Sequence, residues 1–303
     1  MKKICVGILG YGNLGRAVEE IVLNDDRFKL ICIFSHRNIK AKQSFVDSVD
    51  NLSNYKNKID ILFLCGGSSS TLVKDAKVAL KLFNIIDAFD THKKINTYIK
   101  CCDVIAKQNS KIAFCSFGWD PGLFSLMRVL FNSLDKKVYT TWGKGVSQGH
   151  GEAVRKIPNV IDAIQYTIPN KRMILKIKNG KFVKGNIHRR LCYVVAKKIY
   201  QKEIKQKILN MPNYFVGYKT DVKFISEDEI KKHKKLYHGG EVFTLGNEFN
   251  FSLRTNSNPN LTAKIMVAYS LVEYDFRKKN MFGAYSILDI SIGKLIKNSR
   301  CYL

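Results

Sequence analysis

The sequence predicts an α/β fold in which a doubly wound parallel sheet is followed by a second, α+β domain. Short apolar runs alternate with helical patterns over the first 118 residues. A glycine-rich turn joins the first run to the first helical pattern. After "GWDPG" at 118–122, the regular alternation of strand-like and helical patterns ends. Parallel strands are covered on both faces, so they read as near-continuous apolar runs. The length of 303 residues suits two domains.

The expected elements follow in chain order. Strands of the first domain are expected at the short apolar runs, which lie at 4–9, 29–34, 59–65, 84–89 and 111–116. The first helix is expected at 14–23, where apolar residues recur at helical spacing and form one stripe. Beyond the turn, a helix is expected at 123–134, strands near 138–143, 191–196, 214–225 and 241–254, and a helix at 262–276.

This order of elements also predicts the domains. Residues 1–118 form the expected dinucleotide-binding domain, because the strand–helix alternation ends there. The C-terminal residues 262–303 are expected to pack back on it. Residues 119–261 form the expected substrate-binding domain, built on a mixed or antiparallel sheet.

The formal net charge of +26 does not by itself indicate a nucleic-acid partner. Of the 51 basic residues, 40 are lysines, and they are spread over the chain beside many Asn and Ile residues. A nucleic-acid binder usually gathers its basic residues on one face or helix. We therefore expect no nucleic-acid partner, although a partner for this charge stays open as an alternative.

The cysteine spacing and the hydropathy of the sequence argue against a metal-binding protein and against a membrane protein. The eight cysteines form no CxxC pair and no Cys/His cluster at zinc spacing, so no metal site is expected. No apolar run approaches the roughly 20 residues of a membrane span. The first apolar run is short and leads into a glycine turn rather than a cleavage site. We expect a cytoplasmic protein without a membrane partner.

The turn "GYGNLG" at 10–15 predicts dinucleotide binding. It has the pattern G-x-G-x-x-G, directly after an expected strand and at the start of an expected helix. In a Rossmann-type sheet, Gly10 permits the tight turn, Gly12 lets a pyrophosphate approach the backbone, and Gly15 lets the helix pack on the strand. The helix N-terminus offers free N–H groups to the phosphates.

The residues after the second expected strand favour NADP over NAD. An NAD enzyme usually carries an acid here, about 20 residues after the glycine turn, to bind a ribose hydroxyl. This chain has Ser35, His36 and Arg37 instead. They donate hydrogen bonds or charge to a 2′-phosphate, which a carboxylate would repel. The alternative is a solvated basic loop.

Polar segments follow the next three expected strands. "CGGSSST" at 65–71 offers small residues and hydroxyls to a cofactor, "FDTH" contains Asp90, and "GWDPG" contains Asp120. In open α/β sheets the ligand binds outside the carboxyl ends of the strands, so both acids are expected beside one crevice. Taken singly, either acid is explained equally well as a helix cap or turn residue.

Nine motifs together resemble the meso-diaminopimelate D-dehydrogenase family. They are "GYGNLGR", "FSHR", "FLCGGSSS", "FGWDPGLFS", "WGKGVSQGHGEAVRKIP", "QYTIP", "MPNYFVGY", "HGGEV" and "NPNLTA". They keep the family's order and approximate spacing from residue 1 to about 290, and "WDPG" with "SQGH" is much more specific than the glycine turn.

The resemblance implies a reaction and an assembly. The reaction is reversible NADP-dependent oxidative deamination at the D-centre of meso-2,6-diaminopimelate. Its products are ammonia and L-2-amino-6-oxopimelate, the open form of tetrahydrodipicolinate, in lysine and diaminopimelate biosynthesis. The resemblance also implies a homodimer, with dimerisation assigned to the second domain.

The resemblance also implies the site residues, motif by motif. Asp90 and Asp120 would be catalytic. The residues expected to hold NADP are Gly10, Tyr11, Gly12, Asn13, Leu14, Gly15, Ser35, His36, Arg37, Ser68, Ser69, Ser70, Asp90, Thr91, His92, Trp119, Asp120, Pro121 and Gly122. The residues expected to bind substrate are Asp90, Trp119, Asp120, Trp142, Gln148, Gly149, Thr167, Arg190, His238 and Asn258.

Residue chemistry agrees with this assignment. Diaminopimelate is a zwitterion at both ends, so its site needs acceptors such as Asp90 and Asp120, and donors such as Arg190. His36 stands where the family often has a second arginine, and Gly151 where a serine is usual, which puts one phosphate contact and one substrate hydrogen bond in doubt. Two alternatives remain: a dihydrodipicolinate reductase-like enzyme, and a non-catalytic NADP-binding sensor or adaptor.

Overall fold

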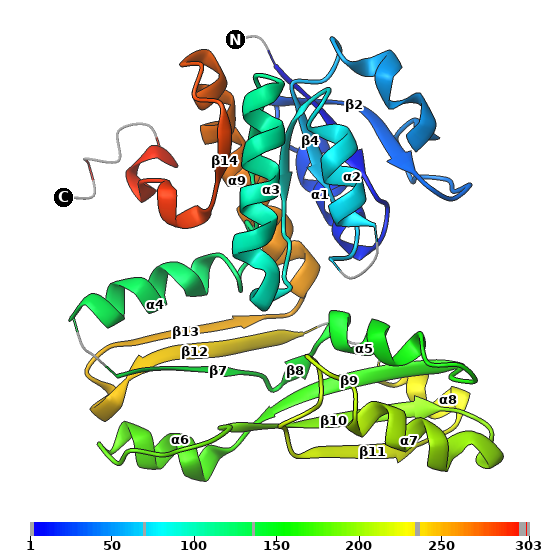
Figure 1. Ribbon diagram of the computed structural model, residues 1–303, viewed down its shortest axis with the longest axis vertical. Helices are drawn as coiled ribbons and strands as arrows, with labels where there is room; N and C mark the ends of the chain where they lie inside the picture. Colours follow the sequence, from blue (N-terminus) through cyan, green and yellow to red (C-terminus); the bar gives the residue numbers. More distant parts are fainter. Residues whose placement is uncertain (1–2, 69–70, 135–136, 234–236, 297–300, 302–303) are drawn as a thin grey trace. The chain divides into compact units, whose positions relative to one another are not determined.

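The computed structural model describes residues 3–68, 71–134, 137–233, 237–296 and 301. The chain divides into two compact units (Figure 1). The first unit contains residues 1–126 and 259–303, and the second unit contains residues 127–258. The C-terminal segment 259–303 therefore belongs to the same unit as the N-terminal sheet.

A parallel sheet forms the centre of the first unit. Among the described residues it has seven strands in the order β14-β6-β5-β4-β1-β2-β3, and every pairing is parallel. The strands are β1 (Ile4–Leu9), β2 (Phe28–Ser35), β3 (Val46–Ser48), β4 (Ile61–Leu64), β5 (Asn84–Asp87), β6 (Ile112–Phe114) and β14 (Gly283–Tyr285). The order 3-2-1-4-5-6 is that of a Rossmann-type sheet, here extended by β14 at one edge.

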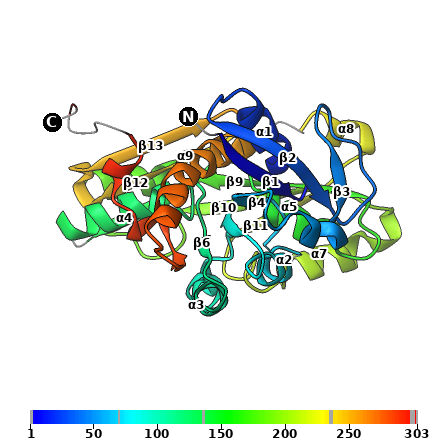
Figure 2. The ribbon, with the colours of Figure 1, turned by 90° about the horizontal axis from the view of Figure 1, so that it is seen from above.

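Helices cover both faces of this sheet, as Figure 2 shows for the first unit. They are α1 (Asn13–Leu23), α2 (Leu72–Ala79), α3 (Ile95–Gln108) and α9 (Asn258–Lys278). Apolar side chains of α1 and α9 pack on one face, and those of α2 and α3 pack on the other. Within β4, Phe63 faces the first layer and Leu64 the second, because successive side chains of a strand alternate.

The second unit contains two smaller sheets among its described residues. One has the order β11-β10-β9-β8 and the other the order β13-β12-β7. Their strands are β7 (Val138–Trp142), β8 (Gly145–Val146), β9 (Asp162–Pro169), β10 (His188–Val195), β11 (Thr220–Phe224), β12 (His238–Thr244) and β13 (Asn250–Thr255). All their pairings are antiparallel except that of β10 with β11.

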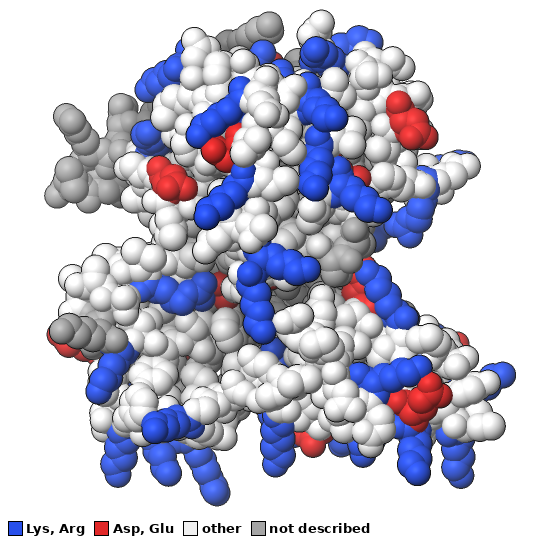
Figure 3. All heavy atoms as spheres, in the orientation of Figure 1, with Lys and Arg blue, Asp and Glu red and all other residues white. Residues whose placement is uncertain are grey.

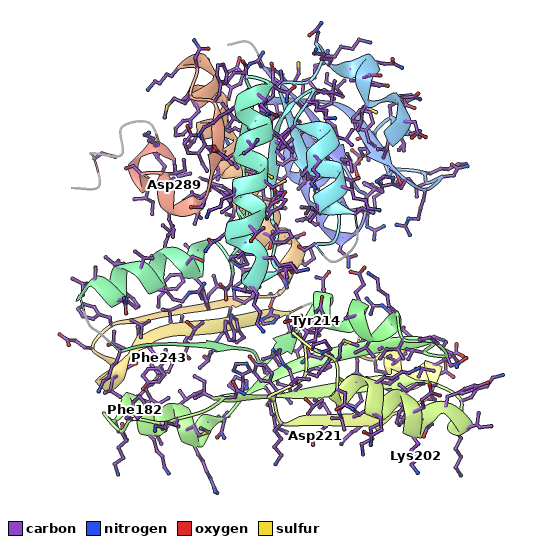
Figure 4. All side chains as sticks on the ribbon, in the orientation of Figure 1. Phe182, Lys202, Tyr214, Asp221, Phe243 and Asp289 are labelled. Atoms are coloured by element: carbon purple, nitrogen blue, oxygen red, sulfur yellow. The ribbon has the colours of Figure 1, made fainter. Side chains whose placement is uncertain are left out.

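Short helices cover these sheets. They are α5 (Gln148–Arg155), α6 (Lys171–Lys178), α7 (Gln201–Leu209) and α8 (Glu227–Lys231), while α4 (Leu123–Leu134) begins in the first unit and continues into the second. Val154 of α5 and Ile204 of α7 pack on one face of β9 and β10. Under α6, the ring of Phe243 stacks with Tyr139 at 5.9 Å between centroids (Figure 4).

The predicted fold class is confirmed, with differences in detail. The structure contains the expected strands of the parallel sheet and also β3 and β14, which were not predicted. In the second unit it adds β8 and β9, and residues 214–218 form turns rather than the start of a strand. No helix within the described ranges has the length and apolar character needed to span a bilayer.

Candidate active site

The glycine turn after β1 has the geometry of a phosphate-binding turn. Gly10 has a φ of +99° and donates its N–H to the carbonyl of Phe34 at 2.9 Å. A Cβ on Gly15 would lie 2.1 Å from the oxygen of Gly10, so only glycine allows this approach of helix to strand. By contrast, a Cβ on Gly12 would meet nothing within 4 Å. The space beside Gly12 is therefore open toward a ligand.

The start of α1 lies at the same place. Its N-cap residue, Gly12, contributes no side-chain cap, and the first turn carries no acidic residue. The first N–H groups of a helix lack intrahelical partners and attract anions. Open space at Gly12 together with these donors fits the pyrophosphate of a dinucleotide.

Tyr11 connects this turn to the loop that follows β2. Its ring is buried, and its hydroxyl donates to the carboxylate of Glu19 and accepts from the N–H of Lys42 at 3.2 Å. The hydroxyl of Ser44 donates to the other oxygen of Glu19 at 2.6 Å. Burial, and next the hydrogen bond to Glu19, raise the pKa of Tyr11. These bonds hold the loop carrying His36 against α1.

The three residues expected to read the 2′-phosphate lie at the end of β2. The Ser35 hydroxyl accepts from the N–H of Arg37 at 3.0 Å, which turns the chain at that point. The Arg37 side chain is exposed, and its guanidinium has no hydrogen-bond or ion-pair partner among the described residues. His36 instead contacts Asp75 of α2, with 2.8 Å between Nε2 and Oδ1.

The loop after β4 reaches the loop after β5 through Ser68. Its hydroxyl accepts from the backbone N–H of Asp90 at 3.0 Å. Ser69 and Ser70, which were also expected to bind the cofactor, lie outside the described residues. Asp90 itself is exposed, and it precedes the short helical turn that begins at His92. The contact positions Ser68 beside the acid that was expected to be catalytic.

A residue that the sequence reasoning missed, Asp87, holds both acidic loops. It lies fully buried at the end of β5. Its Oδ1 accepts from the N–H groups of Phe89 and Ser116 at 2.9 Å each, and its Oδ2 accepts from the hydroxyl of Tyr98 at 2.6 Å. Burial raises the pKa of Asp87, while these donors act in the opposite direction. One side chain thus connects the segments leading to Asp90 and to Asp120.

Asp120 lies on a tight turn directly before α4. Gly122 has a φ of +131°, and a Cβ there would lie 1.7 Å from the oxygen of Gly118. The N–H of Gly118 donates to the carbonyl of Pro121 at 3.1 Å, which closes the turn. Asp120 therefore follows β6 on a tightly closed turn, as Asp90 follows the neighbouring β5.

The residue before Asp120 also packs against the start of α4. Trp119 is buried and packs edge-on against Phe124, with 5.1 Å between ring centroids.

In the second unit, Arg190 and Thr167 occupy paired positions of β10 and β9. The guanidinium Nη1 donates to the Thr167 hydroxyl at 2.9 Å, and its carbon lies 4.4 Å from the centroid of the Tyr218 ring. Arg190 is 8% exposed, and burial lowers its pKa. Its Nε has no partner among the described residues. A buried guanidinium with a spare N–H suits a carboxylate ligand.

His238 and Trp142 lie next to these residues in the second unit's strands. His238 is buried, and its Nδ1 accepts from the N–H of Gly239 at 2.8 Å. A Cβ on Gly145 would lie 2.6 Å from the Cα of His238, so β8 passes directly over it.

The remaining residues expected to bind substrate lie at the ends of elements. Trp142 ends β7 and contacts the His188 ring edge-on at 5.1 Å. Gln148 and Gly149 open α5, and Asn258 opens α9 at the boundary of the unit.

Two further histidines near Arg190 were not expected from the sequence. Burial, and next the charge of Arg190, lower the pKa of His188 to about 4 and that of His150 to about 3. Both ring nitrogens of His188 lack a partner among the described residues. His188 stacks on Tyr218 at 5.2 Å, and His150 meets the ring of Tyr214 (Figure 4) edge-on at the same distance. His150 lies in the motif "SQGH" but was given no role there, and His188 lies in none of the motifs.

The departure at Gly151 lies on the inner side of α5. A Cβ there would lie 3.4 Å from Nη1 of Arg155 and 3.6 Å from the carbonyl of Ala163 in β9. A side chain at this position would therefore meet the body of the second unit. In the part of the chain that the structure describes, no group of three or more His, Cys, Asp or Glu residues is placed to hold a metal ion.

Comparisons with known proteins identify the family to which the chain is similar. The family described as "Diaminopimelic acid dehydrogenase C-terminal domain" matches residues 118–257. A meso-diaminopimelate D-dehydrogenase of Ureibacillus thermosphaericus is 39% identical over 99% of this chain and 97% of its own length. A solved diaminopimelate dehydrogenase of C. glutamicum, in complex with diaminopimelate, has a TM-score of 0.92 at 32% identity, covering 98% of this chain and 97% of its own. An engineered D-amino acid dehydrogenase bound to NADP+ has a TM-score of 0.91 at 31% identity, with the same coverage.

Proposed function

The chain belongs to the meso-diaminopimelate D-dehydrogenase family, and from this we propose that it oxidises the D-centre of meso-2,6-diaminopimelate with NADP+. Substrate, NADP+ and water give L-2-amino-6-oxopimelate, ammonium, NADPH and a proton. The observation that carries the proposal is similarity over nearly the full chain, with the acidic loops after β5 and β6 and the buried Arg190–Thr167 pair in place.

The residues at the carboxyl ends of β1 and β2 hold NADP. The open space beside Gly12 and the start of α1 receive the pyrophosphate, and Arg37 pairs with the 2′-phosphate. When bound, the cofactor supplies the hydride acceptor. The protein contributes position and electrostatics. The backbone N–H groups at the start of α1 favour an anionic ligand at that place, and so does the absence of an acidic residue from the first turn of this helix.

We assign Asp90 and Asp120 to the D-centre. Hydride leaves that carbon only after the ammonium has become a neutral amine, so a carboxylate, or a water that it orients, accepts a proton first. The same groups then orient the water that adds to the resulting imine, before ammonia departs. Asp87 acts through the backbone by fixing both loops, and is therefore a positioning residue.

We assign Arg190, Thr167 and His238 to the other end of the substrate. The assignment is supported by the Nε of Arg190, which has no partner among the described residues, and by the Thr167 hydroxyl bonded to the same guanidinium. Both would donate to the carboxylate of the L-centre. Stacking on Tyr218 holds the guanidinium in place, so little side-chain entropy remains to be lost when the carboxylate binds. Binding energy from this end orients the reacting carbon.

The reaction is tested by product stoichiometry. Incubation of the protein with meso-diaminopimelate and NADP+ is expected to yield NADPH and ammonia in equal amounts. In the reverse direction, NADPH oxidation with tetrahydrodipicolinate is expected to require ammonium. Ammonium-independent oxidation of NADPH by dihydrodipicolinate would instead identify a reductase of the dihydrodipicolinate type.

A homodimer, with the second unit as its dimerisation domain, and a cytoplasmic location complete the proposal. The support for both is membership of the family. Light scattering coupled to size exclusion is expected to give twice the mass of one chain, and a monomer at micromolar concentration would contradict the dimer.

A further inference from the structure

The loop after β2 contains no carboxylate at the expected position, but a carboxylate from α2, that of Asp75, contacts this loop. Asp75 is only 5% exposed and places its Oδ1 2.8 Å from Nε2 of His36. The His36 side chain is about half exposed, at 48%. An exposed imidazole is thus anchored at one nitrogen by a buried acid, at the position where a Rossmann-type protein reads the 2′ group of the adenosine ribose.

This contact determines what the other nitrogen of His36 can do. A carboxylate only accepts hydrogen bonds, so Nε2 carries the proton that is shared with Asp75. Nδ1 forms no hydrogen bond with any described residue, and Oδ2 of Asp75 has none either. With Nε2–H committed to Asp75, Nδ1 is a bare acceptor in the neutral imidazole and an N–H donor in the imidazolium.

The two states of Nδ1 match the two forms of the cofactor. A 2′-phosphate accepts hydrogen bonds and needs a donor, whereas a 2′-hydroxyl can donate to a bare nitrogen. The charged groups beside His36 are Asp75 on α2 and Arg37, the next residue of its own loop. Arginine side chains stay charged in proteins, whereas histidine is the side-chain type whose charge can change between about pH 5 and 8.

We propose that the His36–Asp75 pair makes cofactor specificity depend on pH: Nδ1 of His36 donates to the 2′-phosphate of NADP when the imidazole is protonated, and accepts from the 2′-hydroxyl of NAD when it is neutral. The inference rests on the proposed use of NADP. Asp75 orients the ring through its contact with Nε2. Binding of NADP+ therefore takes up a proton at His36, and binding of NAD+ does not.

Isothermal titration calorimetry tests this without relying on catalysis. NADP+ and NAD+ are titrated in buffers of different ionisation enthalpy, between about pH 6.5 and 9, so that the number of protons exchanged is measured directly. For the native protein, uptake of up to one proton is expected with NADP+ and none with NAD+. The affinity for NADP+ is expected to fall across this range by about tenfold more than in His36→Gln.

Two variants separate the roles of the pair. His36→Gln retains a hydrogen-bonding side chain but cannot titrate, so proton uptake above about pH 7, where the phosphate is already a dianion, should vanish. Asp75→Asn keeps the imidazole but removes the carboxylate that orients its ring, so proton uptake with NADP+ should be smaller than in the native protein. Thermal unfolding confirms that each variant is folded.

The outcomes distinguish this inference from the proposed function. Equal proton uptake in the native protein and His36→Gln, or none in the native protein at any pH, would overturn the inference while NADP binding stands. Failure of both cofactors to bind the native protein would overturn the proposed function as well.

Discussion

In the proposed function, single side chains at the end of β2 determine the choice of cofactor. Because Arg37 is exposed and its guanidinium has no partner among the described residues, it is available to a phosphate. Loss of a charged hydrogen bond costs about 1.5–3 kcal/mol. Arg37→Ala is therefore expected to raise the KM for NADP+ by about tenfold or more and to leave weak NAD+ activity nearly unchanged. Lys40→Ala, an exposed cation on the same loop, is the matched control in steady-state assays. Equal losses with both cofactors would contradict the assignment.

The two ends of the substrate are expected to respond differently to substitution. If Asp120 is the proposed proton acceptor at the reacting centre, Asp120→Asn removes that acceptor and changes little in shape, so kcat should fall more than KM rises. Arg190→Ala removes a carboxylate donor remote from the chemistry, so its main effect should be on KM. Full initial-rate curves with meso-diaminopimelate measure both parameters. Unchanged kcat in Asp120→Asn would show that the reacting centre has been placed wrongly.

The histidines near Arg190 make stability depend on pH. Burial lowers the pKa of His188 to about 4 and of His150 to about 3, below the value near 6.5 of an unfolded chain. Between these values the unfolded state binds more protons, so stability is complete above about pH 6.5 and falls as the pH decreases toward 4. Each group contributes at most about 1.4 kcal/mol per pH unit.

His188→Phe tests this linkage, because it keeps a ring between Trp142 and Tyr218 but cannot titrate. The slope of the free energy of unfolding against pH, measured by urea denaturation from about pH 4 to 7, is expected to become shallower than in the native protein. Measurement at about pH 8 corrects for any change in packing. Identical slopes would show that His188 is not buried as a neutral base.

Sequence reasoning identified residues within motifs, but it missed those that act through tertiary contacts. Asp75 lies 39 positions from His36 and belongs to no motif. Their contact exists only because α2 packs on the same face of the sheet as side chains of β2. Asp87 left a faint signal, an acid within the apolar run "NIIDAF". The sequence does not show that the carboxylate of Asp87 accepts hydrogen bonds from the two adjacent loops, because those loops meet it only in the folded structure.

Strand β5 and its neighbour β6 carry the acidic loops, and Asp87 holds the two together. Asp87→Ala would leave the N–H groups of Phe89 and Ser116 and the hydroxyl of Tyr98 without an acceptor, so we expect a loss of about 3 kcal/mol or more in unfolding free energy. It should also lower kcat, because both loops loosen. Asp87→Asn keeps an oxygen for both N–H groups and should lose less.

Tyr98→Phe is the control for this loop connection, since it removes only the third hydrogen bond. It is expected to reduce stability without a comparable loss of kcat. Chemical denaturation and initial rates of the three variants, measured side by side, provide the comparison. If Asp87→Ala is destabilised but retains full kcat, Asp87 serves stability alone.

Elements with a strong apolar pattern were predictable, and those with polar interior residues were not. The strands expected at 4–9 and 29–34 correspond to β1 and β2, because nearly all of their residues are apolar, Lys29 being the exception in 29–34. Strand β9 was missed because its buried face carries Gln165 and Thr167, which pattern-based reasoning places on a surface. The unpredicted strand therefore contains a residue of the expected site.

For the molecule as a whole, the charge of +26 fits a solvated surface. Lys and Arg side chains on the visible face belong to many elements of both units, with acidic residues among them (Figure 3).

Stereochemical choice among the isomers of diaminopimelate tests the account most directly. Only the meso isomer offers a D-centre for reaction together with an L-centre for Arg190 and Thr167. The LL isomer turns its reacting hydrogen away from the cofactor, a misplacement that is very costly to rate. Initial rates of NADPH formation with meso-, LL- and DD-diaminopimelate are expected to show turnover of the meso isomer far above both others. Comparable rates on the meso and LL isomers would contradict the proposed site.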